Sequence, residues 1–238
     1  MANSDRRPTT LATIARWPFG VGLTSWRYLW RTTPMHRREL EGSLGEDAPP
    51  PLPEGLSREG LQPPDAGIGP LFHRTYRARI RESEVEAKEL LRLVTEEPNR
   101  ASPSEFASFH KLEGEEGRMN AGDEYVVRMA GPWDGPVRVA VSAEDRFRLA
   151  TLDGHLEAGQ IEFRARDEDG EVIFEIESWA RSKDRLTDLL YDRLRMSKEV
   201  QLHMWVSTLE HVADLSGGRL RGGLSILTRI VPPEALGD

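Results

Sequence analysis

The sequence predicts an α+β protein in which a curved antiparallel sheet of about six or seven strands wraps around one long C-terminal helix. Between residues 125 and 177, short stretches of alternating apolar and polar residues are separated by turn residues, which is typical of antiparallel strands with one wet face. From about Ser182 to Leu215, apolar residues recur at helical spacing instead. Because a twisted sheet curls, we expect the helix to lie against its concave side.

The composition limits the functional classes. The chain has 238 residues, of which 38% are hydrophobic, and a formal net charge of -8. Nucleic-acid binding is not expected, because the neutralisation of phosphates needs clustered Lys and Arg. The absence of cysteine excludes disulfides and thiol chemistry and permits a reducing compartment. No apolar run approaches the roughly 20 residues of a membrane-spanning helix, so we expect a cytoplasmic protein, with any membrane contact peripheral.

The first 40 residues differ from the rest of the chain and are predicted to form an N-terminal arm. Residues 1–40 hold seven arginines and two acidic residues, together with Trp17, Trp26 and Trp30. Trp beside Arg is typical of a segment that lies in a membrane interface. The favoured interpretation is that the tryptophans dock the arm on the protein's own apolar surface. Peripheral membrane contact and partner binding are the alternatives.

The segment after the arm is predicted to be a linker. Proline and glycine dominate residues 41–68, and the run Pro49-Pro50-Pro51 enforces an extended, semi-rigid path. A spacer is favoured over a proline-rich ligand for a partner domain.

A globular domain is expected over residues 69–216. It begins with an alternating strand over residues 71–80. Ser83 and Glu86 then match a capping box, and the apolar seam that follows predicts a helix to about residue 95. A short helical turn is expected over residues 99–105. Further strands are predicted over 106–112, 125–129, 137–141, 146–150, 161–166 and 172–177.

The C-terminal part holds the longest predicted element. A helix over residues 182–215 would be roughly 50 Å long, and Gly217-Gly218 would end it. Residues 217–238 are predicted to be a C-terminal extension. Its apolar run over 224–231 fits either a strand or a short helix.

Three local motifs stand out in the predicted domain. They are Gly131-Pro132-Trp133-Asp134-Gly135-Pro136-Val137-Arg138-Val139, Thr151-Leu152-x-Gly154-His155-x-Glu157-x-Gly159-x-x-x-Phe163 and Ser178-Trp179-Ala180-Arg181. The motifs resemble an uncharacterised domain-of-unknown-function family of bacteria and plants that is related to the START-like, or SRPBCC-type, superfamily, and the predicted topology resembles the helix-grip fold of START-like proteins. Where that family usually has proline or an acid, this chain has Asp153, Leu156 and Gln160. The resemblance implies the fold and a hydrophobic-ligand cavity, and the family has no established reaction to transfer.

His155 and Glu157 are the candidate catalytic pair. They lie two residues apart, so on an extended segment their side chains point the same way and could share a hydrogen bond. Such a pair could transfer protons, with the carboxylate orienting the imidazole, as in a cyclase- or hydrolase-type enzyme. The favoured interpretation is structural, because a glycine-bounded turn needs polar groups to satisfy its bent backbone.

A curved sheet cannot close fully over a straight helix, and the space left between them is the predicted binding site for a small hydrophobic ligand. Its candidate lining residues are Tyr125, His155, Trp179 and Trp205. Arg138 is expected to face water. No metal site and no cofactor are expected, because the His and Glu spacings match no ligand signature. The leading hypothesis is thus a ligand-binding module, with an enzyme and a membrane-associated scaffold as alternatives.

Overall fold

The computed structural model describes residues 33–103, 107–129, 134–183 and 196–237. Trp17, Trp26 and Trp30 of the predicted arm lie outside the described residues. Among the described helices, none has the length and apolar character needed to cross a membrane.

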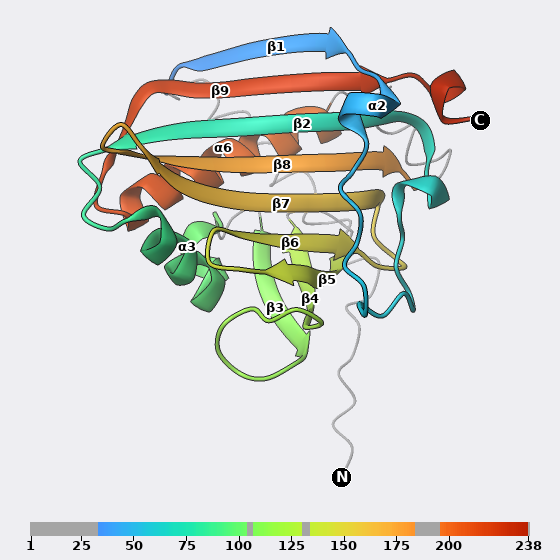
Figure 1. The fold of residues 1–238 in the computed structure, drawn as a ribbon, viewed down its shortest axis with the longest axis horizontal. Coiled ribbons are helices and arrows are strands. Elements are labelled where there is room, and N and C mark those ends of the chain that lie inside the picture. The colour runs from blue at the N-terminus through green and yellow to red at the C-terminus, as the bar shows by residue number, and fades with distance from the viewer. Residues whose placement is uncertain (1–32, 104–106, 130–133, 184–195, 238) are drawn as a thin grey trace.

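Within these residues, nine strands form one sheet in the order β1-β9-β2-β8-β7-β6-β5-β4-β3 (Figure 1). All neighbours are antiparallel except β1 and β9, which run parallel. The sheet is therefore mixed and larger than the six or seven antiparallel strands that were predicted. The strands are β1 (Met35–Glu41), β2 (Ile68–Arg81), β3 (Ala107–Glu113), β4 (Glu124–Met129), β5 (Asp134–Ser142), β6 (Arg146–Thr151), β7 (Glu157–Glu168), β8 (Glu171–Ser182) and β9 (Arg219–Val231).

The two strands that the sequence did not predict lie next to each other at one side of the sheet. β9 pairs with both β1 and β2, so the segment taken as a C-terminal extension is an inner strand of the same sheet. Its apolar run over residues 224–231 was predicted to be either a strand or a short helix, and the structure shows a strand. β1 falls in the predicted arm, and its sequence gives little signal because nearly all its residues are exposed.

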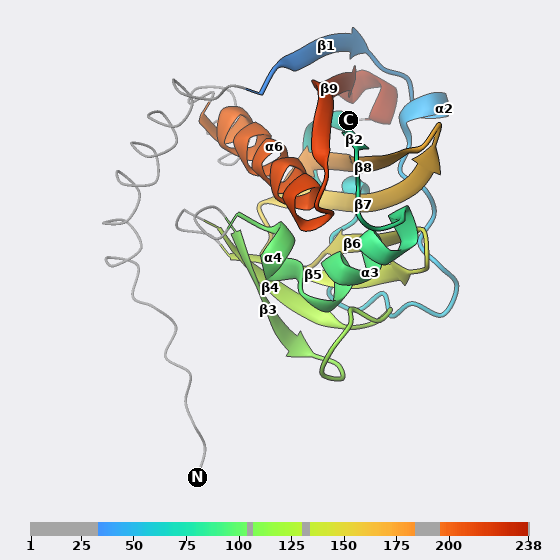
Figure 2. The ribbon, with the colours of Figure 1, turned by 90° about the vertical axis from the view of Figure 1, so that its left-hand side faces the viewer.

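The helices α3 (Ala87–Glu96), α4 (Pro98–Ala101) and α6 (Met196–Leu215) lie on the concave side of the sheet (Figure 2). The end of α6 at Leu215 agrees with the prediction, and Gly217 follows with a positive φ of 73°. At the other end, β8 continues to Ser182, which was expected to start the helix. Residues 184–195 of the predicted helix lie outside the described part of the chain.

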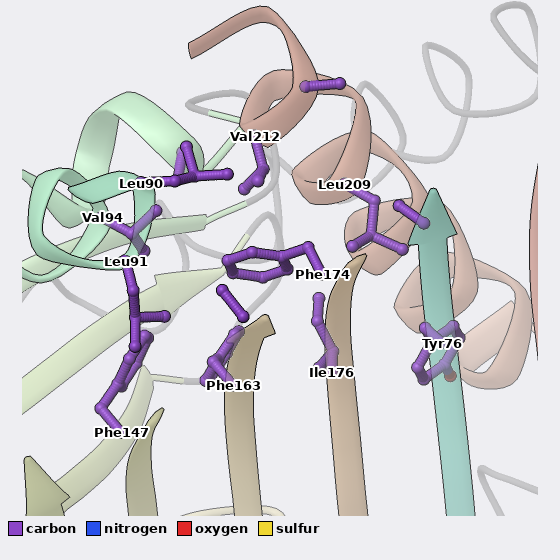
Figure 3. Close-up of a cluster of buried hydrophobic side chains, with 14 of the residues drawn as sticks. Tyr76, Leu90, Leu91, Val94, Phe147, Phe163, Phe174, Ile176, Leu209 and Val212 are labelled. Atoms are coloured by element: carbon purple, nitrogen blue, oxygen red, sulfur yellow. The ribbon is translucent and has the colours of Figure 1, made fainter. Parts of the chain in front are cut away.

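The main hydrophobic core lies between the concave face and these helices. Strand residues that face the concave side, such as Phe163, Phe174 and Ile176, belong to the same core cluster as Leu209 and Val212 of α6 (Figure 3). α3 adds a second apolar face to the same core. Its buried residues are Ala87, Leu90, Leu91, Val94 and Thr95.

The predicted linker lies across the convex face, in front of β8, β7 and β6 in Figure 1. We call residues 43–67 the strap. It includes α2 (Leu44–Asp47) and the 3-10 helix η1 (Pro64–Ala66). Prolines cannot donate backbone hydrogen bonds, and an extended proline-rich path leaves its carbonyl oxygens without internal partners. Side chains of the sheet supply those partners.

Buried arginines hold the strap on the sheet. Arg148 Nη1 donates to the carbonyl of Pro51 at 3.1 Å, and Arg138 Nη1 donates to the carbonyls of Ser57 and Glu59 at 2.9 and 2.8 Å. Arg138 was expected to face water, but the strap covers it and leaves it 9% exposed. No local pattern predicts this contact, because the two segments that form it lie about 80 residues apart in the chain.

Candidate functional site

An apolar cavity lies between the concave face and α6. Its volume is about 30 Å³, which is room for about one water-sized group and far below the roughly 300–1,000 Å³ of ordinary ligand pockets. The concave side is thus largely filled by core side chains where the structure describes it. The aromatic and sulfur-containing part of the lining consists of Phe109, Met119, Phe147, Phe163, Phe174, Met204 and Trp205.

Trp205 lines this cavity. Its ring meets Phe163 edge-on at a centroid distance of 5.8 Å, and Phe163 stacks on Phe147 at 4.5 Å. The indole Nε1 is buried, yet no described atom accepts its hydrogen bond. Buried polar groups in folded proteins are nearly always paired, so each exception needs an explanation.

A polar cluster lies next to the cavity on the same face. Arg74 of β2 is 6% exposed and donates from Nη1 to Gln201 Oε1 at 3.0 Å. Gln201 Nε2 donates to both carboxylate oxygens of Glu157 at 3.0 and 3.2 Å, and Arg74 lies 4.0 Å from that carboxylate. Gln201 stands one helical turn before Trp205 on α6, so cluster and cavity adjoin.

Ser178 belongs to this cluster by register. It pairs with Arg74 across β2 and β8, and with Ile161 across β7 and β8. Its hydroxyl is buried and makes no hydrogen bond within the described structure. Tyr76 lies two residues along β2, where burial raises the pKa of its phenol to about 12. The proton is therefore held on that oxygen at neutral pH.

Two more buried polar atoms lack partners in the part of the chain that the structure describes. They are Nε of Arg118 and Nδ1 of His211. Neither residue lines the cavity. Of these four unpartnered atoms, Trp205 Nε1 belongs to a residue of the cavity lining, and Ser178 Oγ belongs to the neighbouring polar cluster.

His155 and Glu157 do not form the predicted imidazole–carboxylate pair. His155 Nδ1 accepts the backbone N–H of Glu157 at 2.9 Å, while the Glu157 carboxylate turns to Gln201. Burial lowers the pKa of the imidazole, which keeps it neutral at physiological pH. Gln62 of the strap donates to the backbone carbonyls of both residues at 3.0 and 2.8 Å. The contacts of His155 thus stabilise the turn, whereas Glu157 belongs to the polar cluster.

Trp179 does not line the space beneath α6, which corrects the prediction. Neighbouring side chains of a strand point to opposite faces, and Ser178 takes the concave side. Trp179 therefore points to the convex face, where it stacks on His73 at a centroid distance of 5.2 Å. It contacts a small separate core with Leu71 and Val231.

Tyr125 is a core residue of β4. Its ring meets Phe109 edge-on at a centroid distance of 6.4 Å, and the Lys111 ammonium lies 5.3 Å from the ring centre. Burial raises the pKa of its phenol. Phe109 lines the cavity whereas Tyr125 does not. Tyr125 therefore packs against a lining residue without lining the cavity itself.

The sequence reasoning missed Arg74, Ser178 and Gln201. Arg74 has an even number, which places it on the same face of β2 as Tyr76. Strict parity along the strand would have revealed a charged residue among the apolar side chains of the concave face. Gln201 gave no such signal, because a polar residue on an amphipathic helix is expected to face water.

A buried charged network occupies the convex face beneath the strap. His73 Nδ1 and Nε2 each lie 2.7 Å from a carboxylate oxygen, of Asp47 and Glu177 respectively. Burial alone lowers the pKa of His73, but the hydrogen bonds to Glu177 and Asp47 outweigh it and raise that pKa. No group of three or more His, Asp or Glu side chains in the described ranges is arranged to hold a metal ion.

The chain was compared with curated protein sequences and with solved structures. No curated protein sequence matches the chain. Among solved structures, a hypothetical protein of Helicobacter pylori is 8% identical with a TM-score of 0.44, over 60% of this chain and 86% of that protein. The ginseng major latex-like protein 151 from Panax ginseng is 12% identical with a TM-score of 0.37, over 56% of this chain and 97% of its own. Ara h 8.0201 is 12% identical with a TM-score of 0.39, over 60% of this chain and 99% of its own.

The family comparison agrees with the motifs that the sequence displays. The turn around His155 and the segment around Trp179 both fall inside the matching region. The predicted resemblance to a domain of unknown function is confirmed, because residues 105–209 match the family DUF1990.

Proposed function

We propose that this protein is a helix-grip module that holds a small, mainly apolar molecule between the sheet and α6. The observation that carries the proposal is the indole N–H of Trp205, a buried donor without a described partner at the wall of an aromatic cavity. An unpaired buried donor costs about 1–3 kcal/mol. A carbonyl or hydroxyl oxygen on a bound molecule would satisfy it, so the proposed ligand carries at least one oxygen acceptor.

The cavity volume sets a condition on this proposal. A space of about 30 Å³ must widen before it admits even a single aromatic ring. Met204 is placed to allow this, because it lines the cavity and an unbranched thioether side chain changes rotamer readily. Ligand entry is therefore expected to displace side chains of α6 while the sheet keeps its shape.

The two alternative functions have less support. An enzyme that uses His155 with Glu157 would need the imidazole to face the carboxylate, but its ring nitrogen accepts from the backbone instead. A membrane-associated scaffold would depend on Trp17, Trp26 and Trp30, which lie outside the described residues. The ligand-binding proposal depends on neither.

Calorimetry with the full chain tests the proposal, using acetophenone and ethylbenzene as a matched pair of probes. The two probes have similar shape, but only acetophenone offers a carbonyl acceptor. We expect acetophenone to bind roughly 3–10-fold more tightly, because one neutral hydrogen bond contributes about 0.5–1.5 kcal/mol. Trp205→Phe keeps an aromatic ring, removes the donor and should make the two affinities equal.

Trp179→Phe is the matched control, because this tryptophan lies on the convex face. It should leave the preference for acetophenone unchanged. The proposal is rejected if neither probe binds the full chain, or if Trp205→Phe leaves the preference intact.

A further inference from the structure

We infer that Arg74, Ser178, Gln201 and Glu157, which lie beside the cavity, form a second recognition point that takes an uncharged oxygen group of the bound molecule. This inference rests on the proposed function. It concerns the end of the ligand opposite the oxygen that would bond to Trp205.

The available hydrogen-bonding capacity at this point is the first argument. Ser178 is 5% exposed, and its buried hydroxyl has no hydrogen-bond partner among the described atoms. Arg74 stands opposite it in the register and shows one hydrogen bond, from Nη1 to Gln201. A guanidinium carries five N–H donors. An oxygen atom between these two side chains would therefore meet donors from both strands.

The charge balance decides which kind of oxygen group fits. Glu157 lies 4.0 Å from Arg74, and Gln201 links the two by hydrogen bonds. The Arg74 guanidinium also lies 4.5 Å from the centre of the Phe72 ring. The positive charge thus already has its counter-ion. A carboxylate would add an unbalanced negative charge beside Glu157 in a poorly solvated site, which is costly, whereas a hydroxyl or carbonyl would not.

The spacing of the two recognition points limits the ligand further. Ser178 pairs with Ile161, and Phe163, which touches Trp205, lies two residues along β7. Two residues of a strand span about 7 Å. Along α6, Gln201 precedes Trp205 by four residues, or about 6 Å. The two estimates agree, so the ligand's two oxygens are expected roughly 6–7 Å apart, across one ring or a short chain.

Three probes test this chemistry by calorimetry on the full chain: acetophenone, 4-hydroxyacetophenone and 4-acetylbenzoate. They share the ketone and differ at the opposite end of the ring. The expected order is 4-hydroxyacetophenone tightest, by roughly 3–10-fold over acetophenone, and 4-acetylbenzoate weakest. Ser178→Ala should remove the advantage of the hydroxyl probe and leave acetophenone binding unchanged. Ser83→Ala removes a hydroxyl that bonds to Val85 O beside α3 and should preserve the full order.

The outcomes separate this inference from the proposed function. Equal affinity for acetophenone and its hydroxyl derivative, or an unchanged ratio in Ser178→Ala, overturns the inference while the Trp205 proposal stands. Tightest binding of 4-acetylbenzoate also overturns it, because the site would then select a charge. If none of the three probes binds, both proposals fall together. Thermal unfolding of Ser178→Ala confirms that any change reflects binding in a folded protein.

Discussion

The two faces of the central sheet differ in how fully their buried polar groups are hydrogen-bonded. On the convex face, arginines and acids form ion pairs, and the remaining donors bond to carbonyls of the strap. On the concave face, Ser178 and Trp205 present buried groups without partners in the described structure. Burial without a partner is costly. The buried polar groups of the convex face therefore stabilise the fold, whereas the two unpartnered groups of the concave face remain able to hydrogen-bond to the proposed ligand.

The difference explains why charge density is a poor guide to function in this protein. The convex face holds most of the buried charges, yet its groups already satisfy one another. The concave face holds fewer buried polar groups, and two of them, Ser178 Oγ and Trp205 Nε1, lack partners among the described residues. The candidate site is therefore marked by unmet hydrogen bonds and not by the number of titratable residues.

The largest expected effect comes from removing a buried charge partner on the convex face. Arg148 Nε donates to Glu162 at 2.8 Å, and the two side chains are 9% and 4% exposed. Arg148→Met leaves Glu162 buried with a weakened counter-charge and also frees the Pro51 carbonyl. We expect a loss of about 3–5 kcal/mol in the free energy of unfolding, measured by urea titration.

Arg92→Met is the control for that loss. Arg92 pairs with Glu89 and Glu96 on the surface of α3, where exposed pairs contribute little. Its midpoint of urea unfolding should stay close to that of the unmodified chain. Equal losses in the two variants would mean that the strap adds nothing to the convex face.

A pH effect is expected from His73, whose two ring nitrogens face carboxylates. Its pKa is raised in the folded state above the ordinary value of 6.5, so folding favours the protonated ring. The stabilisation is complete below about pH 6.5 and is lost as the pH rises through the folded-state pKa. The surrounding charges are Asp47 and Glu177 with their own partners Arg229 and Arg164.

Thermal midpoints between pH 6 and pH 9 measure this effect. The midpoint should fall as the pH rises, and His73→Gln should remove that slope. His110→Gln, on the exposed side of β3, should keep it. A slope that survives in His73→Gln would assign the titration to another group.

The smallest expected effects compare two buried hydroxyls, one with hydrogen-bond partners and one without. Thr151 Oγ1 donates to the Gln62 carbonyl at 2.8 Å and accepts from Gly159 N at 2.9 Å. Thr151→Val should therefore cost about 1–3 kcal/mol, because it leaves a buried donor unpaired. Ser178→Ala removes a hydroxyl without a described partner and should leave stability unchanged or slightly higher. A loss in Ser178→Ala as large as that in Thr151→Val would show that Ser178 is satisfied in solution.

The sequence predicted the elements whose burial follows a regular period. The strands from β2 to β8 were found from alternation, α3 from its apolar seam and the end of α6 from the glycines after Leu215. The predicted capping box was wrong, because α3 begins at Ala87 with Glu86 as its N-cap and without a side-chain cap, and the Ser83 hydroxyl donates to Val85 O. β1 was missed because nearly all its residues are exposed, so its sequence shows no alternation of apolar and polar residues. The strap was predicted to be a spacer. Its contacts with the sheet are made by backbone carbonyl oxygens, and because every residue has one, no residue type in the sequence indicates them.

The candidate site was predicted only in part, for a related reason. Trp205 was found because an aromatic residue on an amphipathic helix is visible in the sequence. Trp179 was predicted to line the space beneath the helix, but β8 continues past the predicted end at residue 177 and places Trp179 on the convex face. Ser178 could not be found at all. A buried serine becomes informative only when coordinates show that nothing bonds to it.

The indole N–H resonance of Trp205 provides the sharpest test of the account. It is identified in a ¹H–¹⁵N spectrum of the full chain as the indole signal that Trp205→Phe removes. Acetophenone should move this signal downfield by supplying the missing acceptor, and ethylbenzene should leave its hydrogen-bonding shift nearly unchanged. If saturating acetophenone leaves the Trp205 signal in place, the concave face does not receive a ligand at Trp205, and the account is contradicted.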